Sequence, residues 1–195
     1  MSDDGELVSR MQRGDMAAFE EVYHKYKRRL YQTALAITGD RGAAEEVLQD
    51  CFVRAYAARA RVDTSVSISP WLYRIIVNLS YNWTNRNRRW PLALDAVADY
   101  LGASPAYGPE LVAEGSERSR IVREAVAALP VKHRAVVVLF HFQGFSLQEI
   151  ADILNCPVGT VKSRLHRAGE ILRARLSQDK RLEGEWAGEV AYVTN

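Results

Sequence analysis

The sequence predicts an all-α protein made of two helical domains joined by a flexible linker. Apolar residues recur every three or four positions across residues 19–83 and again across residues 121–172, the period of a helix packed on one side. Between these segments, residues 91–117 contain three of the six prolines and three of the twelve glycines, a composition typical of a linker. The chain has 195 residues, 48% of them hydrophobic, which is enough for two small cores. The predicted parts are a first domain (1–90), a linker (91–117), a second domain (118–176) and an acidic C-terminal tail (177–195).

The first domain is predicted to begin with two consecutive helices. An apolar stripe runs from Phe19 to Ile37, and Gly39 can end this helix in the left-handed conformation. Asp40 can then cap a second helix over residues 43–59. The apolar stripe of that second helix consists of Ala44, Val47, Leu48, Cys51, Phe52, Ala55 and Tyr56.

A polar loop, residues 63–69, leads into a third helix. Ser69 followed by Pro70 is a strong start signal, with serine as the N-cap and proline at the first helical position. Tyr73 and Tyr81 lie off the apolar stripe of this helix, so both rings are predicted to be exposed. Residues 92–101, within the linker, could form a further short helix. The buried stripe of the third helix is predicted to be Leu72, Ile75, Ile76, Leu79 and Trp83.

The second domain contains two short helices joined by a tight turn. Helical periodicity over residues 121–129 stops at Pro130, and residues 131–142 are apolar around most of a helix. Ser146 and Glu149 match the capping box S-x-x-E at the start of the next helix. Asn-Cys-Pro at residues 155–157 then predicts a tight turn, followed by a helix whose buried stripe is Val161, Leu165, Ala168 and Leu172. This is the helix-turn-helix pattern.

Composition argues against several classes of protein. The longest apolar run, residues 135–140, is far too short to span a bilayer, and the acidic N-terminus does not resemble a secretory signal. Cys51 and Cys156 cannot complete a disulfide framework or a four-thiolate zinc site. Glu21 and His24 have the E-x-x-H spacing of a di-iron helix, but no second copy is present. We expect a cytoplasmic protein that is not an enzyme and has no cofactor or metal; an all-α metalloenzyme is the disfavoured alternative.

The distribution of charge favours nucleic acid as a partner. The net charge is +3 for residues 1–90 and +4 for residues 125–176, but −3 for residues 91–124 and −2 for residues 177–195. The second helix of the helix-turn-helix exposes basic and hydroxyl side chains suited to a major groove. The helix that follows Ser69 interleaves rings, amides and arginines, which can stack on unpaired bases and contact phosphates. A solvated polar face is the alternative interpretation of each surface.

Two sets of motifs resemble conserved regions of one family, the bacterial extracytoplasmic-function (ECF, group IV) sigma factors of the sigma-70 family. The resemblance to region 2 is carried by GDMAAFEEVY (14–23), AEEVLQDCF (44–52) and PWLYRIIVNL (70–79). The resemblance to region 4 is carried by LPVKHR (129–134), FSLQEIA (145–151) and PVGTVKSRLHRA (157–168). Both sets occur in the order and spacing of that family.

The resemblance implies an alternative sigma factor that binds core RNA polymerase and directs promoter recognition, DNA opening and transcription initiation. It implies docking on the clamp helices of the β′ subunit through Glu45, Glu46, Gln49, Asp50 and Phe52. It implies recognition of the −10 element by Arg61, Ser67, Ser69, Tyr73, Arg74, Asn78, Tyr81, Asn82, Asn85 and Arg86. It implies a second domain that sits on the β flap and reads the −35 element through Thr160, Lys162, Ser163, Arg164 and Arg167. Promoter DNA and an anti-sigma factor are further implied partners, without direct membrane insertion.

A helix-turn-helix regulator that binds duplex operators is the alternative function. Residues 44–89 distinguish the two, because such a regulator needs no clamp-binding helix followed by residues that capture a single strand. Asn82 and Asn85 stand where the family often has Asp and Arg, and Ile68 where it often has an aromatic, so the preferred −10 sequence is left open. We expect the free chain to bind DNA weakly and the holoenzyme to bind strongly and with salt sensitivity. The tail, with Trp186 and Tyr192, is hypothesised to be a regulatory or partner-docking extension.

Overall fold

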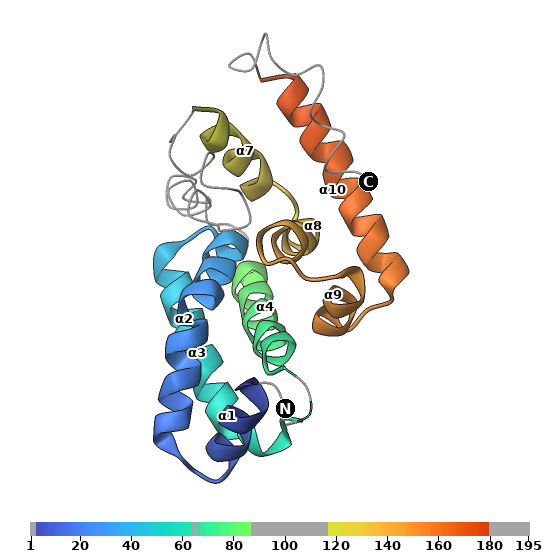
Figure 1. Ribbon diagram of the computed structural model, residues 1–195. Coiled ribbons are helices and arrows are strands. Elements are labelled where there is room, and N and C mark those ends of the chain that lie inside the picture. Colours follow the sequence, from blue (N-terminus) through green and yellow to red (C-terminus); the bar gives the residue numbers. More distant parts are fainter. Residues whose placement is uncertain (1–2, 64, 66, 87–116, 180–195) are drawn as a thin grey trace.

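The computed structural model describes residues 3–63, 65, 67–86 and 117–179, and these form helices without any strand (Figure 1). The first unit consists of α1 (Asp3–Gln12), α2 (Met16–Thr38), α3 (Arg41–Ala58), the 3₁₀ turn η1 (Arg59–Arg61) and α4 (Ser69–Arg86). The second consists of α7 (Glu117–Ala127), α8 (Val131–Val137), the π-helical segment η2 (Val138–Phe142), α9 (Leu147–Leu154) and α10 (Val158–Ser177). The predicted all-α class with two helical units is confirmed. Within these residues, no helix combines the length and hydropathy that a bilayer crossing requires.

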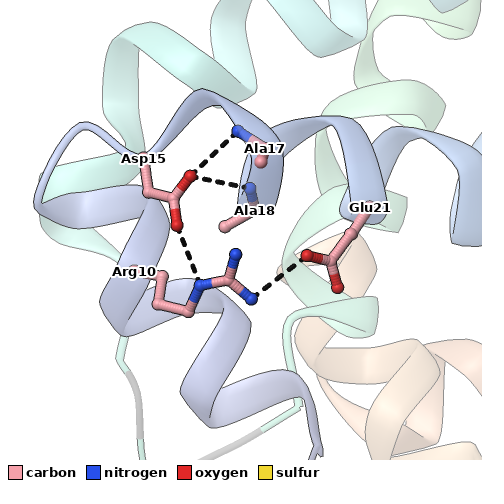
Figure 2. Close-up of polar contacts among 5 residues, drawn as sticks. All are labelled: Arg10, Asp15, Ala17, Ala18 and Glu21. Atoms are coloured by element: carbon pink, nitrogen blue, oxygen red, sulfur yellow. Dashed lines mark hydrogen bonds and ion pairs between the residues drawn. The ribbon is translucent and has the colours of Figure 1, made fainter.

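A polar network fixes the corner between α1 and α2 (Figure 2). Asp15 is the N-cap of α2, and its Oδ1 accepts hydrogen bonds from the backbone N–H groups of Ala17 (2.9 Å) and Ala18 (3.2 Å). Its Oδ2 accepts a 2.9 Å hydrogen bond from Nε of Arg10, near the end of α1. Nη1 of Arg10 also donates to Glu21 at 3.1 Å. Arg10 therefore ties the end of α1 to the first two turns of α2.

The predicted boundary between α2 and α3 is confirmed. Gly39 has a φ of 74° and donates its backbone N–H to the carbonyl oxygen of Leu35 at 2.8 Å. Glycine is suited to this position because it adopts positive φ without a Cβ clash. Asp40 follows as the N-cap of α3, with its side chain accepting from the N–H of Ala43 at 2.7 Å. α2 starts at Met16, three residues before the predicted stripe.

The start of α4 differs in detail from the prediction. The helix begins at Ser69 itself, so this residue is not the N-cap. Instead, the hydroxyl group of Ser67 accepts a 3.2 Å hydrogen bond from the backbone N–H of Ser69. A serine two residues earlier thus satisfies an amide that would otherwise lack an intrahelical partner.

The helix-turn-helix has the predicted local structure. Both bonds of the capping box are present: Ser146 Oγ accepts from the N–H of Glu149, and Glu149 Oε2 accepts from the N–H of Ser146 at 2.8 Å. Asn155 ends α9 in the left-handed conformation, with a φ of 49°. Ile150 and Ile153 of α9 are buried.

The two units pack directly against each other (Figure 1). α4 lies beside α9 and also contacts α8, and the end of α2 contacts α8 and η2. Leu72 and Ile76 of α4 belong to the same continuous core as Leu139 and Ile150 of the second unit. The sequence predicts two small domains with a core each, joined by a flexible linker, so this shared core differs from that expectation.

A buried arginine bridges the two units. Arg134 of α8 is only 4% exposed, and its Nη1 donates a 2.7 Å hydrogen bond to the carbonyl oxygen of Ile37 at the end of α2. Its Nη2 donates to the carbonyl oxygen of Leu129 at 2.9 Å. Burial lowers the pKa of Arg134 to about 10. The guanidinium lies at the negative end of the α2 dipole, where a cation is favoured.

Several predictions concern residues outside those that the structure describes. These are the linker up to residue 116, the short helix at 92–101 and the tail from residue 180. The exact boundaries of the domains therefore stay predictions.

Candidate nucleic-acid and polymerase interfaces

The N-terminal half of α10 carries the side chains predicted to read the −35 element. Val161 and Ala168 are fully buried and fix the rotation of the helix, so that its polar face is turned outward. Such a face at the start of the second helix is what entry into a major groove requires. Of the predicted residues, Lys162, Ser163 and Arg167 are exposed, and Thr160 and Arg164 are half-buried.

Two arginines on this face already contact their own chain. Arg167 donates a 2.9 Å hydrogen bond to Glu170, and this bond holds the pKa of Glu170 below its ordinary value. Arg164 is directed toward the turn, where its Nη1 lies 3.9 Å from Sγ of Cys156. A contact of Arg167 with DNA therefore has to compete with an intrahelical ion pair.

Tyr73 is buried, and the prediction that its ring is exposed is wrong. The residue is 1% exposed, and its ring meets Phe145 edge to face with 4.7 Å between the ring centroids. Its hydroxyl group donates a 2.7 Å hydrogen bond to Oε1 of Gln143, and burial raises its pKa to about 12. The prediction fails because α4 is covered on two sides: α2 and α3 cover one, and the second unit covers the other.

Tyr81 and Arg74 face the second unit as well. Tyr81 is half-buried rather than exposed, and burial raises its pKa to about 12. Its hydroxyl group has no hydrogen-bond partner among the described residues. Arg74 is exposed, but its Nη2 donates to the backbone carbonyl of Asp152 in α9. In this arrangement, three of the residues predicted to contact the −10 element lie at or beside the contact between the units.

The remaining predicted residues of α4 form an open polar face. Their spacing of three and four places them along one side of the helix, away from the core. Amides and a guanidinium in this arrangement can meet base edges and phosphates. The exposed residues are Asn78, Asn82, Asn85 and Arg86.

The loop before α4 presents polar side chains next to that helix. Arg61 and Ser67 are exposed, and Ser69 is half-buried. Within the loop, Asp63 Oδ1 accepts hydrogen bonds from both the N–H (2.8 Å) and the hydroxyl (2.7 Å) of Ser65. These two hydrogen bonds fix Ser65 relative to Asp63.

The outer face of α3 carries most of the side chains predicted to bind polymerase. Phe52 is the exception: it is 5% exposed and packs under Tyr23, with 4.8 Å between the ring centroids. Val53, which is not among the predicted residues, is 68% exposed on this helix. Its position off the apolar stripe was the signal that could have found it. The exposed predicted residues are Glu45, Glu46, Gln49 and Asp50.

Neither a metal-binding cluster nor an activated Cys51 is present among the described residues. Among them, no group of three or more His, Cys, Asp or Glu side chains could hold a metal ion. Cys51 is buried, and burial raises the pKa of its thiol to about 12, whereas a reactive cysteine needs a lowered pKa. Fold and site together define a two-unit, helix-turn-helix nucleic-acid-binding protein.

Comparison with known families assigns both units. A family model described as "Sigma-70 region 2" matches residues 22–90, and one described as "Sigma-70, region 4" matches residues 119–170. The ECF RNA polymerase sigma factor SigW of Bacillus subtilis is 35% identical over 178 residues, covering 87% of this chain and 94% of the relative. The ECF RNA polymerase sigma-E factor of Escherichia coli K12 is 32% identical over 173 residues, covering 85% and 90%. The chain belongs to the ECF sigma factors of the sigma-70 family, which direct RNA polymerase to promoters and initiate transcription.

Two solved structures share the fold. CnrH, in complex with the cytosolic domain of CnrY, matches with a TM-score of 0.68 and 24% identity over 90% of this chain and 98% of CnrH. RpoE of Bartonella quintana, in complex with the anti-sigma factor NepR, matches with a TM-score of 0.62 and 24% identity over 83% and 98%.

Proposed function

We propose that this chain confers promoter choice on core RNA polymerase through three separate surfaces. The outer face of α3 docks on the β′ clamp helices, with Glu46, Gln49 and Val53 at its centre. Phe52 supports this face from below through its contact with Tyr23. The observation that carries the proposal is the presence, in one chain of this family, of a helix-turn-helix and an outward polar face on α3.

The −10 surface consists of the loop before α4 and the polar face of α4. Asn78, Asn82 and Asn85 contact bases of the separated strand, and Arg61 and Arg86 follow its phosphates. The −35 surface is the start of α10, where Lys162, Ser163 and Arg167 enter the major groove. The second unit rests on the β flap, and the linker at 91–117 connects the two surfaces across the polymerase.

The packed arrangement is incompatible with simultaneous contact to both promoter elements. Elements at −10 and −35 are about 25 base pairs apart, which is about 85 Å along B-form DNA at about 3.4 Å per base pair. α4 and α9 instead lie side by side. The units therefore separate when the chain joins the polymerase, and the free chain binds promoter DNA weakly.

An anti-sigma factor is the partner that holds the chain inactive. This part of the proposal is supported by the complexes in which the two structures of similar fold were solved, one of them with an anti-sigma factor. The chain acts in the cytoplasm, has no catalytic activity of its own and uses the chemistry of the polymerase. The tail beyond residue 177 serves as a docking extension.

Run-off transcription with purified core polymerase across genomic fragments tests the proposal. We expect the chain to form a stable assembly with core polymerase and to produce new transcripts with defined starts. A chain that binds duplex operators tightly on its own and adds no transcript with core polymerase would instead be a helix-turn-helix regulator.

A further inference from the structure

Helix α1 holds both ends of the loop that precedes α4. Where the loop begins, Nε2 of Gln12 donates hydrogen bonds to the carbonyl oxygens of Val62 (2.8 Å) and Arg59 (3.2 Å). Where it ends, the carboxylate of Asp4 accepts a 2.7 Å hydrogen bond from the hydroxyl group of Ser67. Asp4 and Gln12 lie near opposite ends of α1, about 12 Å apart at about 1.5 Å per residue. One helix therefore contacts both described ends of the loop.

The carboxylate of Asp4 is buried and held in place by hydrogen bonds. The residue is 7% exposed, and its Oδ1 accepts a 2.7 Å hydrogen bond from Nζ of Lys25. Its Oδ2 accepts from the hydroxyl of Tyr26 at 2.8 Å as well as from Ser67. Burial alone would raise the pKa of Asp4, but the hydrogen bonds from Lys25, Ser67 and Tyr26 outweigh it and hold the pKa below its ordinary value. The carboxylate is therefore charged and accepts hydrogen bonds from three donors. Hydrogen bonds to a charged acceptor are stronger than those between neutral groups.

The helix that carries Asp4 and Gln12 is itself anchored. Leu7, Val8 and Met11 are buried in the core of the first unit. The polar network of Arg10 attaches the end of α1 to α2 (Figure 2). A helix fixed on its apolar side and at one end can hold a neighbouring loop in place.

Ser67 connects Asp4 to the start of α4 through two hydrogen bonds of its hydroxyl group. Its hydroxyl donates to Asp4 and accepts from the backbone N–H of Ser69, the first residue of α4. Ile68, between these two serines, is 1% exposed and packed into the core. The end of the loop and the first turn of α4 are therefore set by one chain of contacts that starts at Asp4.

We infer that α1 is a brace for the loop, and that Asp4 and Gln12 are positioning residues for recognition of the −10 element. This inference rests on the proposed function of the loop. Asp4 itself is buried; it acts through Ser67, as Gln12 acts through the backbone of Val62. A loop whose two ends are already fixed loses less conformational entropy when it captures an unpaired base. Removing the brace therefore weakens base capture and reduces discrimination between −10 sequences.

The experiment compares Asp4→Ala and Gln12→Glu with the wild type, in the free chain and in the holoenzyme. Gln12→Glu keeps the shape of the side chain but removes both N–H donors. Amide hydrogen exchange at residues 63–68 of the free chain is expected to become faster in both variants. Open-complex formation, followed by permanganate reactivity of −10 thymines, is expected to fall about tenfold, which corresponds to the ordering cost of about one residue. The ratio of transcription between two promoters that differ only in the −10 element is expected to shrink.

Two control variants separate positioning from stability. Tyr26→Phe removes one donor to the same carboxylate without touching the loop, and Glu6→Ala removes an exposed charge from the same helix. Both are expected to keep the wild-type −10 selectivity, even where Tyr26→Phe lowers thermal stability. Unchanged loop exchange in Asp4→Ala and Gln12→Glu, or equal loss of selectivity in Tyr26→Phe, overturns the inference. A wild-type chain that gives no transcript refutes the proposed function, while the exchange measurement still decides whether α1 braces the loop.

Discussion

The hydroxyl group of Tyr73 in α4 donates a 2.7 Å hydrogen bond to the side-chain oxygen of Gln143, which precedes α9 in the other unit. Gln143 also accepts, through its backbone carbonyl, a 3.3 Å hydrogen bond from Arg29 of α2. The first unit thus contacts the segment that leads into the helix-turn-helix. As long as this contact persists, the ring of Tyr73 is covered and cannot meet DNA.

Replacing Gln143 by alanine is expected to shift the free chain toward separated units. The change leaves the buried hydroxyl of Tyr73 without its acceptor, which costs about 1–3 kcal/mol and favours separation by about tenfold. Energy transfer between dyes at positions 24 and 173, one on each unit, measures the separation. Gln148→Ala, at an exposed position of α9, serves as the control and is expected to leave the distance unchanged. An unchanged distance in Gln143→Ala would show that this contact does not hold the units together.

Local signals in the sequence were sufficient for three of the predicted helix ends. Gly39, Asp40 and the Ser146–Glu149 capping box all make the predicted bonds, because each depends only on residues within four positions. The start of α4 was misassigned by the same logic: two serines lie two positions apart, and the sequence does not show which hydroxyl meets the amide.

The contact between the units could not be predicted from periodicity. A helical stripe reveals one buried face, but α4 has two, so Tyr73, Val77 and Ser80 are buried in addition to the expected Leu72, Ile76 and Leu79. Which second surface covers α4 is a property of tertiary packing and leaves no fixed spacing in the sequence. The brace of α1 on the loop was missed for a related reason: Asp4 and Ser67 are 63 positions apart.

Arg134→Met is expected to uncouple the two units and to destabilise the protein by about 2 kcal/mol, because two buried carbonyl groups lose their donor. The carbonyls belong to Ile37 and Leu129, on either side of the contact. Guanidinium denaturation followed by circular dichroism measures the loss, and unfolding is expected to broaden as the units melt separately. Lys132→Met, an exposed change on the same helix, is the control. Equal stability of Arg134→Met and the wild type would contradict a bridging role.

Substitutions of Val53 and of its neighbour Phe52 are expected to change different properties: polymerase binding for Val53 and folding stability for Phe52. Val53→Glu places a carboxylate on the exposed polymerase-binding face and is expected to weaken core polymerase binding by about tenfold or more without loss of stability. Phe52→Ala creates a cavity beneath that face and is expected to cost about 3–5 kcal/mol of folding free energy. Affinity for core polymerase and thermal denaturation, measured on both variants, separate the two effects. Val53→Ile should bind like the wild type; tight binding by Val53→Glu would remove this residue from the interface.

Glu170→Gln is expected to strengthen −35 binding by the holoenzyme. The substitution releases Arg167 from an exposed ion pair worth about 0.2–1 kcal/mol and removes a negative charge beside the groove, so a gain of up to about fivefold is expected. Affinity for a duplex −35 fragment, titrated with salt, provides the measurement. The gain from Glu170→Gln should be smaller in the Arg167→Ala background, because that background has no arginine to release. A smaller gain shows that the two residues are coupled, as the 2.9 Å bond indicates; an equal gain in both backgrounds would refute the coupling.

Acidification is expected to weaken the second unit through its histidines. Burial lowers the pKa of His141, and burial together with Arg164 and Arg167 lowers the pKa of His133. Below about pH 6.5 the unfolded chain binds protons at these two histidines more readily than the folded chain does. The free energy of unfolding therefore loses nothing to these groups above that pH. It then falls as the pH drops from about 6.5 toward the folded pKa values.

His141→Gln tests this pH dependence, because glutamine cannot bind the proton that His141 binds on acidification. Its free energy of unfolding should change less between pH 7.5 and pH 5.5 than that of the wild type, and the double variant with His133→Gln should change least. His166→Gln, at an exposed position of α10, provides the comparison. If His141→Gln and the wild type lose stability in parallel over this range, protonation of His141 is not what weakens the fold.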